Sequence, residues 1–99
     1  MRLVLLIGLF VVVACAGPET RIDGVVVAVD GGLSGVASFE IVTREGQRLR
    51  FVPGDGVDAF DDGAPLSHLN EHLQTGAGVR VIYVAEDGVL VALAVSDAP

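Results

Sequence analysis

The segment His68–His72, with the sequence HLNEH, contains the residue types and the spacing that metal chemistry requires. On a helix, residues four positions apart lie one turn apart on the same side, so His68 and His72 can present their imidazole nitrogens to one ion. Imidazole is a common zinc ligand, and the carboxylate of Glu71 can serve as a general base beside such an ion. A catalytic zinc site also needs a third protein ligand and an open coordination position. The sequence therefore indicates a candidate metal site with His68 and His72 as ligands.

The same five residues match the pattern H-x-x-E-H, and in this they resemble the inverted zinc peptidases. The resemblance implies a zinc ion held by both histidines and by a glutamate further along a much larger domain. In this chain the acidic residues between the motif and the last expected strand are Glu86 and Asp87, within a predicted turn. We therefore expect a structural helix whose four polar motif residues face solvent, and metal binding by the two histidines is the alternative. We expect no catalysis and no cofactor.

A second candidate site is a group of four aspartates in the Gly-rich and Pro-rich stretch 53–65: Asp55, Asp58, Asp61 and Asp62. Calcium takes six to eight oxygen ligands, which such a group could partly supply. The spacing lacks the D-x-D-x-D-G pattern and the closing glutamate of a calcium loop. We therefore expect a solvated loop, with Phe60 anchoring it to the rest of the domain.

A third candidate site lies on a predicted β-hairpin that turns near Gly46. In the expected register Arg44, Arg48 and Arg50 share its outer face. Guanidinium groups bind carboxylates and phosphates well, so this patch could bind an anionic glycan, peptide or lipid head group. We expect instead that these arginines pair with neighbouring acids such as Glu40 and Glu45, as surface charges commonly do, and ligand binding is the alternative.

The first residues of the chain have the layout of a secretory signal. Arg2 precedes an uninterrupted apolar run from Leu3 to Ala14, and small residues follow the run. The run is too short to span a bilayer, which takes about 20 apolar residues. We therefore expect a removable leader.

The end of this leader, Val12-Val13-Ala14-Cys15, resembles the lipobox of bacterial lipoproteins. The resemblance implies that residues 1–14 are a signal peptide and that a lipidated Cys15 anchors the protein to a bacterial membrane, on the extracytoplasmic face of the cell envelope. Residues 15–20 would then form the tether, and residues 21–99 the folded domain. Cys15 is the single cysteine of the chain, so its use as the anchor would exclude a disulfide and a cysteine-based metal site in the folded domain.

Charge narrows the range of partners. Without residues 1–14 the chain has 5 arginines, because Arg2 is lost, and 13 acidic residues, which gives a net charge of −8. Nucleic-acid binding depends on clustered positive charge, so nucleic acid is not an expected partner. We expect a binding or interaction module for an envelope protein or an anionic ligand, and a purely structural envelope protein is a further alternative.

Hydrophobic periodicity predicts the elements that would position these sites. Alternating, β-branched runs predict strands, and they cover residues 21–32, 36–44, 47–52, 79–85 and 89–95. Between the third and fourth strands the period becomes helical, with Leu66, Leu69 and Leu73 on one face. Pro65 suits the first turn of this helix, and Gly76 suits the position just past its end.

Two hairpins follow from turn chemistry and side-chain alternation. The Asp-Gly step at Asp87-Gly88 is typical of a tight turn between the last two strands. In the earlier hairpin, pairing Thr43 with Leu49 places the apolar residues on one face and the arginines on the other. This pairing implies a loop of about three residues around Gly46.

The resulting order, three strands, one helix and two strands, resembles the OB-fold, a five-stranded Greek-key barrel. The resemblance covers most of the chain after the leader. It implies a small, mainly β domain with one short helix at the end of the barrel, following an N-terminal signal helix. An SH3-like barrel or another small β-roll is the alternative.

Overall fold

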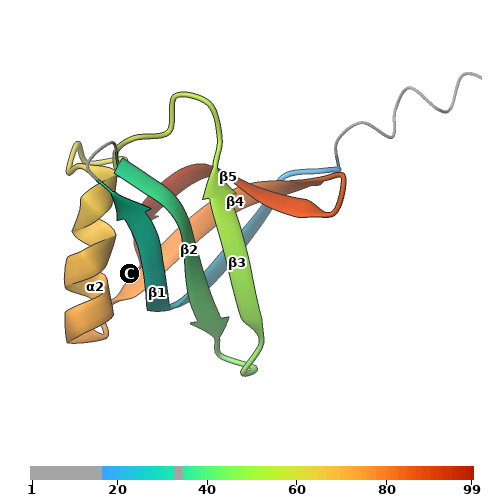
Figure 1. Ribbon diagram of the computed structural model, residues 1–99. Helices are drawn as coiled ribbons and strands as arrows, with labels where there is room; N and C mark the ends of the chain where they lie inside the picture. Colours follow the sequence, from blue (N-terminus) through green and yellow to red (C-terminus); the bar gives the residue numbers. More distant parts are fainter. Residues whose placement is uncertain (1–16, 33–34) are drawn as a thin grey trace, which may run out of the picture.

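The computed structural model describes residues 17–32 and 35–99, which form a closed five-stranded barrel with one short helical segment (Figure 1). The elements are β1 (Thr20–Gly32), β2 (Gly35–Thr43), β3 (Arg48–Pro53), the 3₁₀ turn η1 (Leu66–His68), α2 (Leu69–Thr75), β4 (Gly78–Glu86) and β5 (Val89–Asp97). Around the barrel the order is β1-β2-β3-β5-β4, and β4 closes onto β1. The predicted fold class, a small OB-like barrel, is confirmed. The expected signal helix and lipobox lie outside the described residues.

The long strand β1 closes the barrel because it pairs with two neighbours. Its first half pairs with β4 and its second half with β2, and Gly24 pairs with both. A Cβ at Gly24 would lie 2.7 Å from the carbonyl oxygen of Val42, so only glycine allows this close approach. Beyond Gly24, register shifts at Val26/Ala28 and Asp30/Gly31 interrupt the pairing with β2, and such bulges bend a strand.

The hairpin of β2 and β3 has the predicted faces but a different register. Phe39 pairs with Phe51 and Ile41 with Leu49, so the predicted pairing of Thr43 with Leu49 was wrong by two residues. A shift of two residues keeps every side chain on its face, so alternation alone could not separate the two registers. The turn itself fixes the register, because Thr43 donates its N–H to Gln47 at 2.9 Å and Gly46 has φ 88°.

The second hairpin turns where the sequence indicates. Asp87 and Gly88 have φ values of 52° and 81°, and two central residues with positive φ are the mark of a type I′ turn. Strands β4 and β5 pair antiparallel on either side of this turn. The predicted Asp-Gly hairpin is confirmed.

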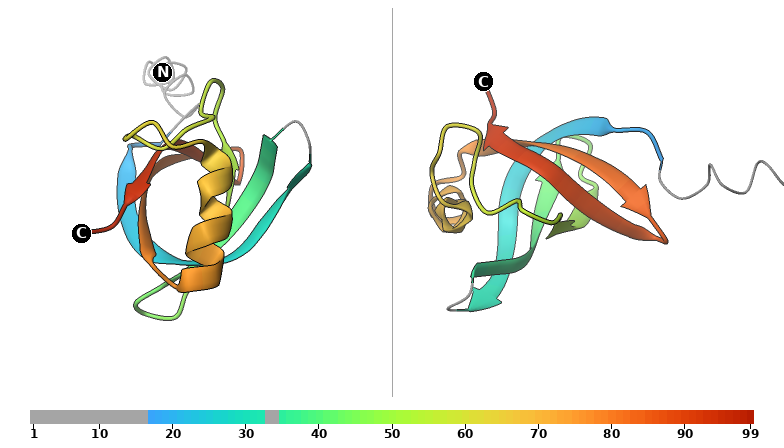
Figure 2. Two further views of the ribbon diagram at one scale, coloured as in Figure 1. Left: turned by 90° about the vertical axis from the view of Figure 1, so that its left-hand side faces the viewer. Right: turned by 90° about the horizontal axis from the view of Figure 1, so that it is seen from above.

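The helical segment covers one end of the barrel (Figure 2). Leu66 and Leu69 are buried as predicted, but Leu73 is 39% exposed and His72 is only 4% exposed. The expectation that His72 faces solvent was therefore wrong. The segment begins with a 3₁₀ turn, which repeats every three residues, so positions 66, 69 and 72 share the inner side.

The barrel interior is a single apolar core. Phe39 and Phe51 are fully buried with their rings 5.4 Å apart, and Tyr83 packs edge-on against Phe51. Phe60 and Leu66 extend this core under the helical segment. Within the described residues, no helix has the length and apolar character needed to cross a bilayer.

Candidate metal centre

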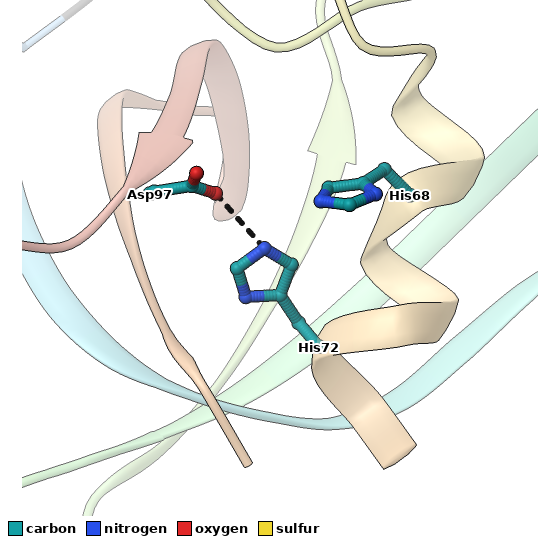
Figure 3. Close-up of side chains that lie close together, drawn as sticks. All are labelled: His68, His72 and Asp97. Carbon is teal, nitrogen blue, oxygen red and sulfur yellow. Dashed lines mark ion pairs between the residues drawn. The ribbon is translucent and has the colours of Figure 1, made fainter. Parts of the chain in front are cut away.

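Three potential metal ligands meet between the helical segment and the end of β5. His68 ends η1, His72 lies in α2, and Asp97 is the last residue of β5. Figure 3 shows the three side chains directed toward one another. One potential ligand atom from each residue lies within 4.8 Å of those of the other two. Among the described residues, this is the group in which three histidine or acidic side chains lie close enough together to hold a metal ion.

Sequence reasoning missed Asp97, although a signal for it existed. Counting back from the Asp87-Gly88 turn places residue 97 near the start of β4, which follows directly after the helix. In the structure Asp97 pairs with Val79, and the amide of the next residue, Ala98, bonds to the carbonyl of Gly78 at 3.1 Å. The hairpin therefore brings a carboxylate from the last strand back to the helix that carries the histidines.

The imidazole of His72 is held between two oxygen atoms. Its Nδ1 lies 2.9 Å from the carbonyl oxygen of Ala77, which can only accept a hydrogen bond, so Nδ1 carries the proton. Its Nε2 lies 2.9 Å from Oδ1 of Asp97. In a neutral ring Nε2 then presents a lone pair to a carboxylate oxygen. This contact is favourable only when a cation, a second ring proton or a metal ion, is shared by the two atoms.

His68 is oriented in a similar way. Its Nδ1 lies 3.3 Å from Oε1 of Glu71. The ring of His68 is directed toward His72 and Asp97, so its other nitrogen, Nε2, is available on that side (Figure 3). Histidines that bind metals commonly donate their second ring N–H to a carboxylate or a backbone carbonyl, which fixes the ring. The carbonyl of Ala77 is such an acceptor for His72, and the carboxylate of Glu71 lies in contact with Nδ1 of His68.

Phe60 supports both imidazole rings. Its ring centroid lies 5.1 Å from that of His68 and 5.5 Å from that of His72, with the second pair stacked. Phe60 is buried, and the backbone beside it is tied to β5 by the bond from the Asp61 amide to the Val95 carbonyl at 3.0 Å. The predicted role of Phe60 as the anchor of its loop is confirmed.

The aspartates of this loop do not form a cluster of metal ligands in the described residues. All four are exposed, and the carboxylate of Asp62 accepts a hydrogen bond from the amide of Ala64 at 3.0 Å. This arrangement matches the solvated loop that the sequence indicates.

The three arginines of the predicted patch lie on or beside the hairpin of β2 and β3. Arg44 lies in the turn beyond β2, whereas Arg48 and Arg50 lie in β3. Arg48 forms an ion pair with Glu40, and Arg50 donates a hydrogen bond to Ser38 Oγ at 3.1 Å. Two of the three guanidinium groups are thus engaged with neighbours on the sheet.

A cross-strand ion pair joins β1 to β4. Arg80 donates to both carboxylate oxygens of Asp23, at 2.7 and 3.0 Å. This hydrogen bonding, together with the positive charge of Arg80, lowers the pKa of Asp23. The same bonding raises the pKa of Arg80. Asp23 is exposed and Arg80 is partly exposed, so the pair is a local surface contact between the two strands that close the barrel.

Comparison with known proteins does not assign this site. No protein-family model matches the chain, and no curated protein is similar to it in sequence.

Proposed function

We propose that this chain is a lipid-anchored, extracytoplasmic metal-binding module that holds a divalent transition-metal ion through His68, His72 and Asp97. The observation that carries the proposal is the 2.9 Å approach of His72 Nε2 to Asp97 Oδ1 while Nδ1 of the same ring is bonded to Ala77. A metal ion resolves this contact by binding both atoms. His68 supplies a third donor on the same side.

The donor set favours zinc and similar ions over calcium or magnesium. Two imidazoles and one carboxylate suit zinc, whereas calcium and magnesium prefer oxygen donors. In tetrahedral zinc sites neighbouring donor atoms lie about 3.4 Å apart, so the His72 and Asp97 atoms are close to binding distance already. The three donor atoms lie up to 4.8 Å apart, which is longer than the donor spacing of a tetrahedral site. The His68 side chain is 29% exposed, and a small rotation of its ring would bring its nitrogen closer to the other two donors.

The membrane location rests on the sequence of the leader. The lipobox-like Val12-Val13-Ala14-Cys15 supports lipidation of Cys15, and β1 begins at Thr20, shortly after it. The module would therefore be held close to the extracytoplasmic face of a bacterial membrane. An interaction of Arg44, Arg48 and Arg50 with an anionic ligand or an envelope protein has less support, because Arg48 and Arg50 have intramolecular partners.

Thermal melts of the full chain in detergent, with and without zinc, test the metal site. A ligand at 100 times its dissociation constant stabilises a fold by about 2.7 kcal/mol. In a domain of this size that raises the melting midpoint by about 10 °C or more. We expect this shift in the wild type and in an Asp55→Asn control, which removes an exposed loop carboxylate.

Asp97→Asn removes the carboxylate with little change in shape, and Asp97 is largely exposed. We expect this variant to lose most of the zinc-dependent shift. An unchanged midpoint of the wild type, or an equal shift in Asp97→Asn, would rule out the proposed site.

A further inference from the structure

We infer that an ion bound by His68, His72 and Asp97 keeps a coordination position open to solvent, and that this position takes a neutral imidazole-type nitrogen from another molecule, such as a histidine-bearing peptide. The inference rests on the proposed metal site and names the ligand that the site would bind through its metal.

The number of ligands leaves the position open. The group contains three donors in the described residues, and zinc in proteins is usually four-coordinate. A further carboxylate, that of Glu71, lies 3.3 Å from Nδ1 of His68 and is not one of the three grouped donors. The fourth donor must therefore come from solvent or from another molecule.

The packing around the two imidazole rings determines the side on which the open coordination position of the ion lies. Phe60, which is buried, stacks on His72, and the carbonyl of Ala77 holds Nδ1 of the same ring. The cluster borders a shallow surface hollow that Phe60 does not line, and the lining of this hollow includes Glu71, Thr75, Ala77 and Ala98. The exposed fractions of 29% for the His68 side chain and 55% for that of Asp97 agree with an opening on this side.

The charges around the open coordination position favour a neutral ligand over an anionic one. The two positive charges of the ion would be balanced by the carboxylates of Asp97 and Glu71, and no arginine lines the hollow. The chain as a whole carries a net charge of −7. An incoming phosphate would meet the carboxylate of Glu71 without a basic partner, whereas a neutral imidazole would meet no such repulsion.

The test uses the full chain in detergent, loaded with Co²⁺, whose visible absorption reports its coordination. Imidazole and inorganic phosphate are titrated separately, and equilibrium dialysis checks that cobalt stays bound. We expect a saturable change of the cobalt spectrum with imidazole, and a phosphate response that requires about tenfold higher concentration or more. Glu71→Gln should narrow this difference, while Glu86→Gln, in the hairpin at the other end of the barrel, should not.

Two results would overturn the inference and leave the metal site standing. One is retained cobalt with no spectral response to imidazole, which would mean that the coordination sphere is already complete. The other is a phosphate response at least as strong as the imidazole response. A chain that binds no cobalt would overturn both the inference and the proposed function.

Discussion

At the scale of single residues, His72 connects stability with the proposed function. Its ring is buried and stacks on Phe60. Its Nδ1 contacts the carbonyl oxygen of Ala77, and its Nε2 contacts Oδ1 of Asp97. From the sequence we predicted that His72 is a possible metal ligand and that it lies on the solvent-facing side of the helix. The error arose because a regular helical period places Leu73 inward, whereas the 3₁₀ turn before α2 places His72 there.

We therefore expect His72→Ala to destabilise the metal-free protein by about 2–3 kcal/mol, through the lost packing and the lost hydrogen bond to Ala77. Denaturant unfolding without metal measures this change. Asn70→Ala, on the exposed side of the same helix, should cost much less. Equal losses in the two variants would show that His72 has no structural role.

Asp23 gives the domain a pH-dependent contact. Because Arg80 lowers the pKa of Asp23 below its ordinary value of 3.8, the native state favours the ionised carboxylate. The resulting stability is fully present above the pKa of the unfolded chain and is lost as the pH falls through the lower, native pKa. The pair is exposed, so the effect is small.

We expect Asp23→Asn to lower the melting midpoint slightly at pH 7 and to have a smaller effect at about pH 2, because the wild-type carboxyl gains a proton as the pH falls through its native pKa. Melts at both pH values measure the difference. In an Arg80→Gln background the effect at pH 7 should vanish. An Asp23→Asn effect that persists there would show that it does not arise from the ion pair.

At the scale of elements, turn chemistry and alternation predicted all five strands and the short helix. The Asp87-Gly88 turn was placed correctly because its residues tolerate positive φ. The β2–β3 register could not be fixed from alternation, since a shift of two residues leaves both faces intact. Asp97 was missed because the search for a third ligand ended at the hairpin turn and did not follow β5 back to the helix.

A substitution at Gly24 tests the explanation of how β1 closes the barrel. Gly24→Ala would place a methyl group 2.7 Å from the Val42 carbonyl oxygen and 3.0 Å from Cδ1 of Ile41. We expect a loss of about 1–3 kcal/mol in the free energy of unfolding, measured with denaturant. The matched change Gly32→Ala meets no atom within 4 Å and should cost little. A smaller loss for Gly24→Ala than for Gly32→Ala would contradict this explanation.

At the scale of the whole molecule, the proposed anchor and the proposed metal site are separate features. The anchor depends on Cys15, the first residue of the proposed tether, whereas the metal ligands lie at the barrel end covered by α2 (Figure 2). The barrel has its own apolar core. Loss of the anchor should therefore leave metal binding intact.

We expect Cys15→Ser, expressed in a bacterial host, to abolish incorporation of labelled fatty acid and to shift the chain from the detergent phase to the aqueous phase. Zinc should stabilise the variant as much as it stabilises the wild type. The opposite pattern, with retained lipid label, would show that Cys15 is not the lipidated residue.

The most direct measurement of the metal site is the X-ray absorption spectrum at the zinc K-edge of the zinc-loaded chain. We expect nitrogen and oxygen donors at about 2.0–2.1 Å and outer-shell scattering from two imidazoles, reduced to one imidazole in His68→Ala. A spectrum with oxygen donors and no imidazole scattering would contradict the assignment of His68, His72 and Asp97 as a metal centre.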